Sequence, residues 1–196
     1  PENEVLVLRS PLESIDQIVV AVHGVRSSGD WADTLHDQLR TDRRFDRTLF
    51  ESLDYPWTMA VVAWGMTWLP WSRHILTDFV SNKLTDLVNR YPGKPIDVIA
   101  HSFGSWLSYH SVRRSLDRQT TIHLRKFIMV GSVLNEWDLL KPVYLGQIQE
   151  VINCWSSNDD VVRLAPPPFG HAGVYGLQNP GGERRHMPPE EQPHPH

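Results

Sequence analysis

The sequence has a single cysteine, no long apolar run and no excess of positive charge, and each shortage excludes a class of protein. Cys154 cannot form an internal disulfide, so no disulfide framework stabilises the chain. The longest apolar stretches, around residues 59–64 and 126–130, are far shorter than the roughly 20 residues of a membrane-spanning helix. A formal net charge of −4 provides no basic field for phosphate backbones, so we expect no nucleic-acid partner.

The chain also opens without the charged, apolar and small-residue series of a signal peptide, which makes the cytoplasm its expected location. Its 196 residues, 40% of them hydrophobic, suit one globular domain. We expect an α/β core over residues 1–165. Residues 166–196 form a Pro/Gly-rich C-terminal segment of the same domain, in which Pro166-Pro167-Pro168 and Pro180-Gly181-Gly182 interrupt regular structure.

Short apolar runs alternate with helix-period segments along the core. The apolar runs predict strands that are buried on both faces, at residues 18–22, 59–63, 96–100, 127–130 and 151–155. The periodic segments predict helices behind Asp30 as N-cap, over residues 72–91, and from just after Ser102 toward Leu116. Together they predict a mostly parallel sheet of about five to six strands with helices on both faces.

The segment Ala100-His101-Ser102-Phe103-Gly104 joins a predicted strand to a predicted helix. A serine at such a junction, flanked at two residues on each side by small residues, fits the sharp turn of a nucleophile elbow. The turn lifts the hydroxyl above the sheet edge and points a helix N-terminus at any oxyanion formed beside it. The alternative is that Ser102 merely caps the helix.

At the end of the first core strand, His23-Gly24 opens the loop 25–29. With this pair and the elbow, the chain resembles the α/β-hydrolase superfamily, and in particular its small serine esterases and lipases. The resemblance implies that the backbone N–H groups of Val25 and Phe103 form an oxyanion hole and that Gly24 lines the substrate site. His23 is then expected to orient the loop.

The resemblance, which covers roughly residues 15–162, further implies the chain order nucleophile, acid, histidine. The acid should follow the strand at 151–155, where the turn contains both Asp159 and Asp160. In the family, the triad acid is an Asp that is followed by a Val three residues later. This spacing selects Asp159, because Val162 stands three residues after it. A solvated turn that uses either carboxylate is the alternative.

Several histidines compete for the role of general base. Spacing from Asp159 favours His186, and His171 is the alternative base, while His194 and His196 stand at the C-terminus. The polar, Gly-rich residues 177–185 depart from the family, in which a strand carries this histidine. His186, His194 and His196 lack regular ligand spacing, so we expect neither a metal nor another cofactor.

The short stretch between the last two predicted strands has no room for a lid domain. Trp68 and Trp71 are either core residues or an exposed apolar rim for an acyl chain or a weak lipid contact. Cys154, inside a predicted strand, is expected to be a small buried residue and not a nucleophile. The sequence therefore predicts a serine hydrolase of small acyl esters or thioesters. The alternative is a catalytically incomplete hydrolase-fold module that binds or scaffolds.

Overall fold

The computed structural model describes residues 15–24, 30–53, 55, 70–116, 121–135, 138, 143, 146–165 and 167–177, and its strands form one sheet. The sheet has five strands in the order β2-β1-β3-β4-β5, and every neighbouring pair is parallel. The strands are β1 (Gln17–Val22), β2 (Thr48–Leu53), β3 (Ile96–His101), β4 (Leu124–Val130) and β5 (Ile148–Cys154).

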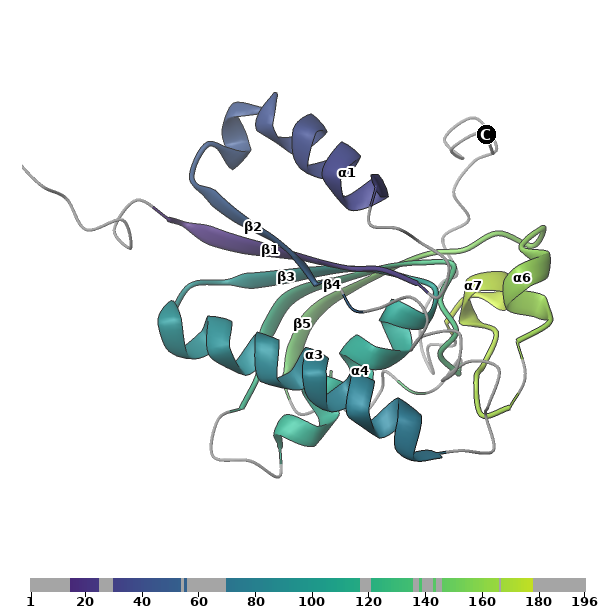
Figure 1. The fold of residues 1–196 in the computed structure, drawn as a ribbon. Helices are drawn as coiled ribbons and strands as arrows, with labels where there is room; N and C mark the ends of the chain where they lie inside the picture. Colours follow the sequence, from purple (N-terminus) through teal and green to yellow (C-terminus); the bar gives the residue numbers. More distant parts are fainter. Residues whose placement is uncertain are drawn as a thin grey trace, which may run out of the picture.

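Helices cover both faces of this sheet. α1 (Asp30–Arg40) lies on one face, and α3 (Pro70–Arg90) and α4 (Phe103–Ser115) lie on the other (Figure 1). The apolar stripe expected on α3 packs into the core, because Leu76, Val80, Leu84 and Leu87 are each at most 2% exposed. The sheet order, the covering helices and the strand–serine–helix turn described below are those of an α/β-hydrolase core, so the predicted fold class is confirmed.

The strand next to β1 is not where the sequence predicted a second strand. β2 occupies residues 48–53 and pairs with β1 in register from Gln17–Thr48 to Val22–Leu53. The expected strand at residues 59–63 lies outside the described residues. β2 contains Thr48, Glu51 and Ser52, and only Leu53 is fully buried, so it has the polar composition of an outer strand and lacks a continuous apolar run.

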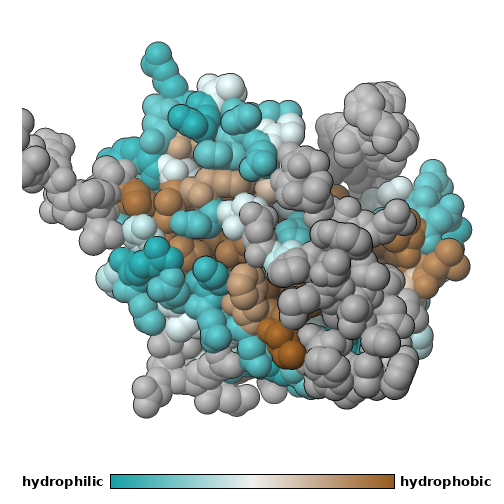
Figure 2. All heavy atoms as spheres, viewed as in Figure 1, coloured by the Kyte–Doolittle hydropathy of each residue, from teal (hydrophilic) through white to brown (hydrophobic). Residues whose placement is uncertain are grey.

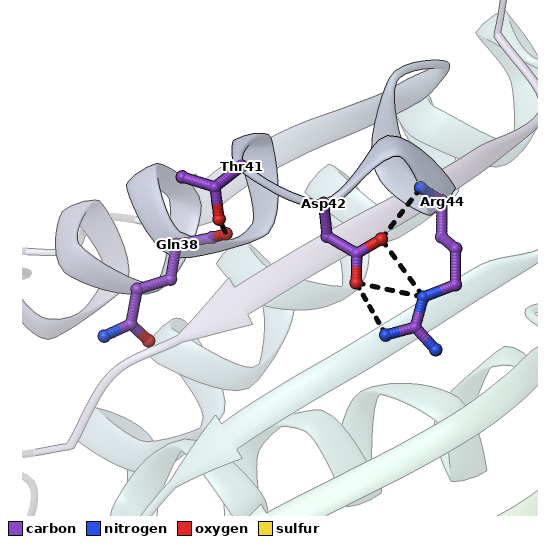
Figure 3. A network of polar contacts seen from close by, with 4 residues as sticks. All are labelled: Gln38, Thr41, Asp42 and Arg44. Carbon is purple, nitrogen blue, oxygen red and sulfur yellow. Dashed lines mark hydrogen bonds and ion pairs between the residues drawn. The ribbon is translucent and has the colours of Figure 1, made fainter.

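A compact polar turn returns the chain from α1 to β2 (Figure 3). The Thr41 hydroxyl donates a 2.6 Å hydrogen bond to the carbonyl oxygen of Gln38, which satisfies one acceptor at the end of α1. Asp42 then caps the single-turn helix η2 (Arg43–Phe45) by accepting from the backbone N–H of Arg44 at 3.0 Å. The same carboxylate pairs with the guanidinium of Arg44.

Two one-turn helices, α6 (Asp160–Arg163) and α7 (Ala172–Tyr175), lie beyond the C-terminal ends of the strands (Figure 1). α7 is attached to this edge by hydrogen bonds from Ser156 N to Gly173 O and from Asn153 Nδ2 to Ala172 O. The C-terminal segment, expected to be mostly loop, is thus anchored at the sheet edge up to residue 177. Within the described part of the chain, no helix is both long and apolar enough to cross a membrane.

Candidate active site

Ser102 stands between β3 and α4 with φ 52° and ψ −122°, and among the described residues it is the only non-glycine residue with positive φ. Its N–H still donates to Val130 O of the neighbouring strand at 2.9 Å. The residue takes the N-cap position of α4, but its hydroxyl makes no capping hydrogen bond. The geometry therefore disagrees with the helix-cap alternative and agrees with the expected elbow.

Glycine at position 104 is required by the close approach of α4 to the end of β1. A Cβ there would lie 2.6 Å from His23 O and would also collide with Val22 O. Ala100, the small residue on the other side of Ser102, is fully buried. The spacing that identified the elbow in the sequence thus has a steric cause, since a larger residue at 104 would push the strand and helix apart.

A chain of buried hydroxyls, which the sequence did not indicate, supports the elbow from below. The Ser105 hydroxyl donates to Ser102 O at 2.6 Å and accepts from Val133 N at 3.3 Å. Ser132 donates to the same Ser105 oxygen at 3.1 Å, and both serines are fully buried. The carbonyl of Ser102 is thereby tied to the segment that follows β4.

Gly24 lies directly against the elbow. A Cβ on Gly24 would be 2.9 Å from the Ser102 Cβ and 3.1 Å from His101 Nδ1, so only glycine allows this approach. His23 is buried with both ring nitrogens in use, since Nδ1 donates to Gly24 O at 2.8 Å and Nε2 accepts from Tyr55 N at 3.3 Å. The His23 ring also stacks on that of Tyr55, while the loop 25–29 that His23 is expected to orient lies outside the described residues.

His101, immediately before Ser102, is a feature of the site that the sequence analysis passed over. Its Nδ1 is buried and has no hydrogen-bond partner within the described part of the chain. Burial lowers the pKa of His101, and the negative charge of Asp159 acts in the opposite direction. The imidazole is therefore neutral at pH 7, and Asp159 is close enough to affect it.

Asp159 reaches the edge where β3 and β4 end. Its Oδ2 lies 3.0 Å from the position that a Cβ on Gly131 would take, and Gly131 directly follows Val130, the backbone partner of Ser102. Its Oδ1 accepts from Val162 N at 3.0 Å, which fixes the carboxylate as the cap of α6. Asp160 by contrast has an 80% exposed side chain that pairs with Arg163, so the geometry favours Asp159 over Asp160.

His171 belongs to a loop that packs on the segment after β4. Gly170 N donates to Val133 O at 2.8 Å and Gly173 N to Ser132 O at 2.7 Å, which holds His171 at this sheet edge. Its ring meets Tyr175 edge-on, and within the described residues no hydrogen bond or ring contact joins it to Ser102 or Asp159. His186, His194 and His196 lie outside the described residues.

Other expected site residues are placed in part. Phe103 begins α4 with its ring buried against Trp106 and Phe169. Val25 and Trp68 lie outside the described residues, and of Trp71 only its position in the first turn of α3 is described. Cys154 is a free, half-buried residue at the end of β5, and burial raises the pKa of its thiol, which disfavours the thiolate that a nucleophile requires.

Exposed apolar side chains next to Asp159 were not anticipated. Val161 is 73% and Leu164 81% exposed, and both belong to the turn of chain that Asp159 caps. Figure 2 shows this brown surface on the right of the molecule, where Figure 1 places α6.

No protein-family model matches the chain, and no curated protein is a significant match. Among solved structures, it is similar to the RedJ thioesterase of the prodiginine biosynthetic pathway in Streptomyces coelicolor, at 15% identity and a TM-score of 0.43 over 67% of this chain and 45% of that chain. It is also similar to the lin2722 gene product of Listeria innocua, at 17% identity and a TM-score of 0.44 over 61% and 53% of the two chains. The chain spans about half the length of these two proteins.

Proposed function

We propose that this chain, which has the α/β-hydrolase fold, is a serine hydrolase that cleaves carboxylic esters or thioesters with Ser102 as its nucleophile. The observation that carries the proposal is the backbone of Ser102, whose φ is positive at a strand–helix junction and whose hydroxyl is not used for capping. Conformations of this kind cost about 1–3 kcal/mol and are concentrated at functional sites.

In the proposed reaction a histidine accepts the proton of the Ser102 hydroxyl as the oxygen attacks the acyl carbonyl carbon. The backbone N–H groups of Phe103 and Val25 stabilise the resulting oxyanion. Collapse of the tetrahedral intermediate expels the alcohol or thiol, which takes the proton from the imidazolium, and water then hydrolyses the acyl enzyme by the same route. Asp159 orients the histidine and stabilises its cation.

The proposal assigns the general base from the sequence alone. Spacing from Asp159 assigns it to His186, with His171 as the alternative. His23 is unsuited to the role, because both of its ring nitrogens are already engaged with backbone groups. His101 precedes the nucleophile directly, and its Nδ1 faces Gly24.

The proposed substrates are short or medium acyl esters that are soluble in water. Only residues 131–147 connect β4 to β5, so the chain has no room there for a lid that would open at a lipid interface. The exposed Val161 of α6 and Leu164, the C-cap of α6, would contact the acyl chain, together with the expected rim of Trp68 and Trp71. The same apolar side chains would allow weak contact with lipid.

Hydrolysis of p-nitrophenyl butyrate by Ser102→Ala and Asp159→Asn tests the proposal. We expect Ser102→Ala to lose on the order of 10⁶ in kcat, as removal of a triad nucleophile does, and Asp159→Asn to lose on the order of 10⁴. Asparagine is also a good helix cap, so this second variant keeps the start of α6 intact. Circular dichroism checks that both variants stay folded.

Matched controls separate the chemistry from general damage. Ser108→Ala removes a buried hydroxyl of α4 that has no hydrogen-bond partner in the described part of the chain, and Asp160→Asn removes the exposed neighbour of Asp159. Both controls should keep wild-type turnover. Full turnover in Ser102→Ala would refute the proposal, and equal losses in Asp159→Asn and Asp160→Asn would refute the assignment of the acid. His186→Ala should abolish turnover and His171→Ala should not, while the reverse would transfer the role of base to His171.

A further inference from the structure

Arginine and histidine side chains gather at the contact between α3 and α4, about two helical turns along α4 from Ser102. Two of them come from the start of α3 and three from the second half of α4, and we call them the α3–α4 basic cluster: Arg73, His74, His110, Arg113 and Arg114. At 1.5 Å per residue, His110 is about 12 Å from Ser102 along the helix axis. The cluster is thus separate from the candidate active site.

Trp106 forms the floor of the cluster. The Arg73 guanidinium carbon lies 5.8 Å from the centre of the Trp106 ring, and the His110 ring is 3.9 Å from it. Trp106 itself is only 8% exposed. The Arg73 Nη1 atom is buried and has no hydrogen-bond partner among the described residues, which is costly for a charged donor.

Negative charge in the cluster is scarce. The Arg114 Nη1 pairs with Asp78 at 2.9 Å, and its Nη2 hydrogen-bonds to His74 Nδ1. Arg73 and Arg113 have no ion pair with any carboxylate of the described residues. Among the described residues, the three guanidinium groups therefore have one ion-paired carboxylate between them, that of Asp78.

The effect of these charges is visible on His110. Burial is the largest cause that lowers the pKa of His110, to about 3, and the positive charges of Arg113, Arg114 and Arg73 lower it further, followed by the neighbouring His74. His110 is therefore a neutral ring at pH 7 that can donate an N–H without adding charge. The three arginines and His74 all lie close enough to His110 to affect its pKa.

We propose that the α3–α4 basic cluster is a binding site for a phosphate-class anion, either inorganic phosphate or the phosphate group of a larger ligand. Arg73 and Arg113, which form no ion pair with any carboxylate in the described part of the chain, together carry the charge that balances a phosphate dianion. Arginine presents planar, charged donors that suit phosphate oxygens, and the buried Nη1 of Arg73 would gain the acceptor it lacks. The site goes beyond the proposed esterase and does not depend on it.

Thermal unfolding and calorimetric titration with sodium phosphate, at an ionic strength held constant with sodium chloride, test this site. At about a hundredfold excess over Kd, phosphate should raise the Tm of the unmodified chain by at least about 5 °C. Arg73→Gln and Arg113→Gln should each weaken phosphate binding by about tenfold or more, because each removes a charged donor. Arg113 is exposed, so its replacement should not prevent folding if that of Arg73 does.

Arg43→Gln is the matched control, because it makes the same charge change at an exposed arginine outside the cluster. Arg43 belongs to η2, which follows α1 in the chain. The control should respond to phosphate like the unmodified chain. Equal responses in all four proteins, or no response in any, would overturn the proposal, because general salt stabilisation acts on every variant alike.

Flotation with phosphatidylcholine vesicles, with and without phosphatidic acid, identifies the source of the phosphate. Selective binding to the phosphatidic acid vesicles that Arg73→Gln abolishes would assign the site to a lipid headgroup. A response to inorganic phosphate without vesicle binding would assign it to a soluble phosphate. Both results support the site, and each is independent of Ser102.

Discussion

Ser102 has a φ of 52°, a region in which a residue with a Cβ is strained and glycine is not. The strand ladder on one side, through Val130 O, and the Ser105 hydroxyl on the other side hold the residue there. The stability lost in this way is compensated by the surrounding packing, including the contact of Gly104 with the end of β1. A serine needed only as a helix cap would gain nothing from this conformation.

Replacement of Ser102 measures the strain directly. Ser102→Gly should raise the free energy of unfolding by about 1 kcal/mol, because release of about 1–3 kcal/mol of strain exceeds the extra entropy of an unfolded glycine. Ser102→Ala keeps the Cβ and should stay within about 0.5 kcal/mol of the unmodified chain. Urea denaturation of the three proteins gives both values. A glycine variant less stable than the alanine variant would show that the residue is not strained.

At the residue scale, the sequence was informative where a residue type has few other uses. Ser102 and Gly104 were singled out because the sharp turn of the elbow needs particular residue types. Asp159 was selected by its resemblance to the family's Asp–Val spacing, and its role stays a prediction. The Ser105–Ser132 hydroxyl chain could not be found, because buried serines that hydrogen-bond across segments have no sequence spacing of their own. His101 also gave no signal, since its importance comes from contact with Gly24.

At the scale of elements, the contact of α4 with α3 should destabilise the folded chain at low pH. His110 is half-buried there, against Trp106 and close to the basic side chains of both helices: Arg73 and His74 of α3, and Arg113 and Arg114 of α4. Its pKa in the folded chain, about 3, is below the ordinary value of 6.5, so the unfolded chain takes up the proton first. The free energy of unfolding should therefore fall as the pH drops below about 6.5. The contribution of His110 to this fall should end near pH 3.

His110→Gln should remove this part of the acid sensitivity. Between pH 7 and pH 4 in phosphate-free buffer, the unmodified chain should lose about 2 to 3 kcal/mol more than the variant. Urea titrations at a series of pH values supply the comparison, with the exposed His123→Gln as control. Parallel stability curves for the unmodified chain and His110→Gln would contradict the prediction.

The helices and strands with a clear pattern of apolar residues were predicted from the sequence, and those without such a pattern were missed. α3 and the strands β1, β3, β4 and β5 have continuous apolar runs or a regular stripe, and they lie within a few residues of the predicted ranges. β2 at residues 48–53 was missed because polar residues interrupt it, and at the side of the sheet a strand does not need two apolar faces. α7 is a single turn whose position depends on contacts with the end of β5.

At the scale of the whole molecule, the order β2-β1-β3-β4-β5 brings distant segments to one edge of the sheet. The ends of β1, β3 and β5 deliver Gly24, Ser102 and Asp159 there, although these residues are up to 135 positions apart in the sequence. The strand alternation predicted this convergence, because carboxyl ends of parallel strands share one edge. The base could not be placed in the same way, since no strand pattern precedes His186.

Covalent labelling with a fluorophosphonate, followed by peptide mapping by mass spectrometry, tests the central claim most directly. An activated serine hydroxyl displaces fluoride and keeps the phosphonyl group, whereas an ordinary serine does not react. We predict one adduct per chain, located on Ser102, and no adduct in Ser102→Ala, while Ser108→Ala is labelled as fast as the unmodified chain. An adduct on any other residue would contradict the assignment of Ser102, and an inert chain would contradict it and favour a binding or scaffolding module.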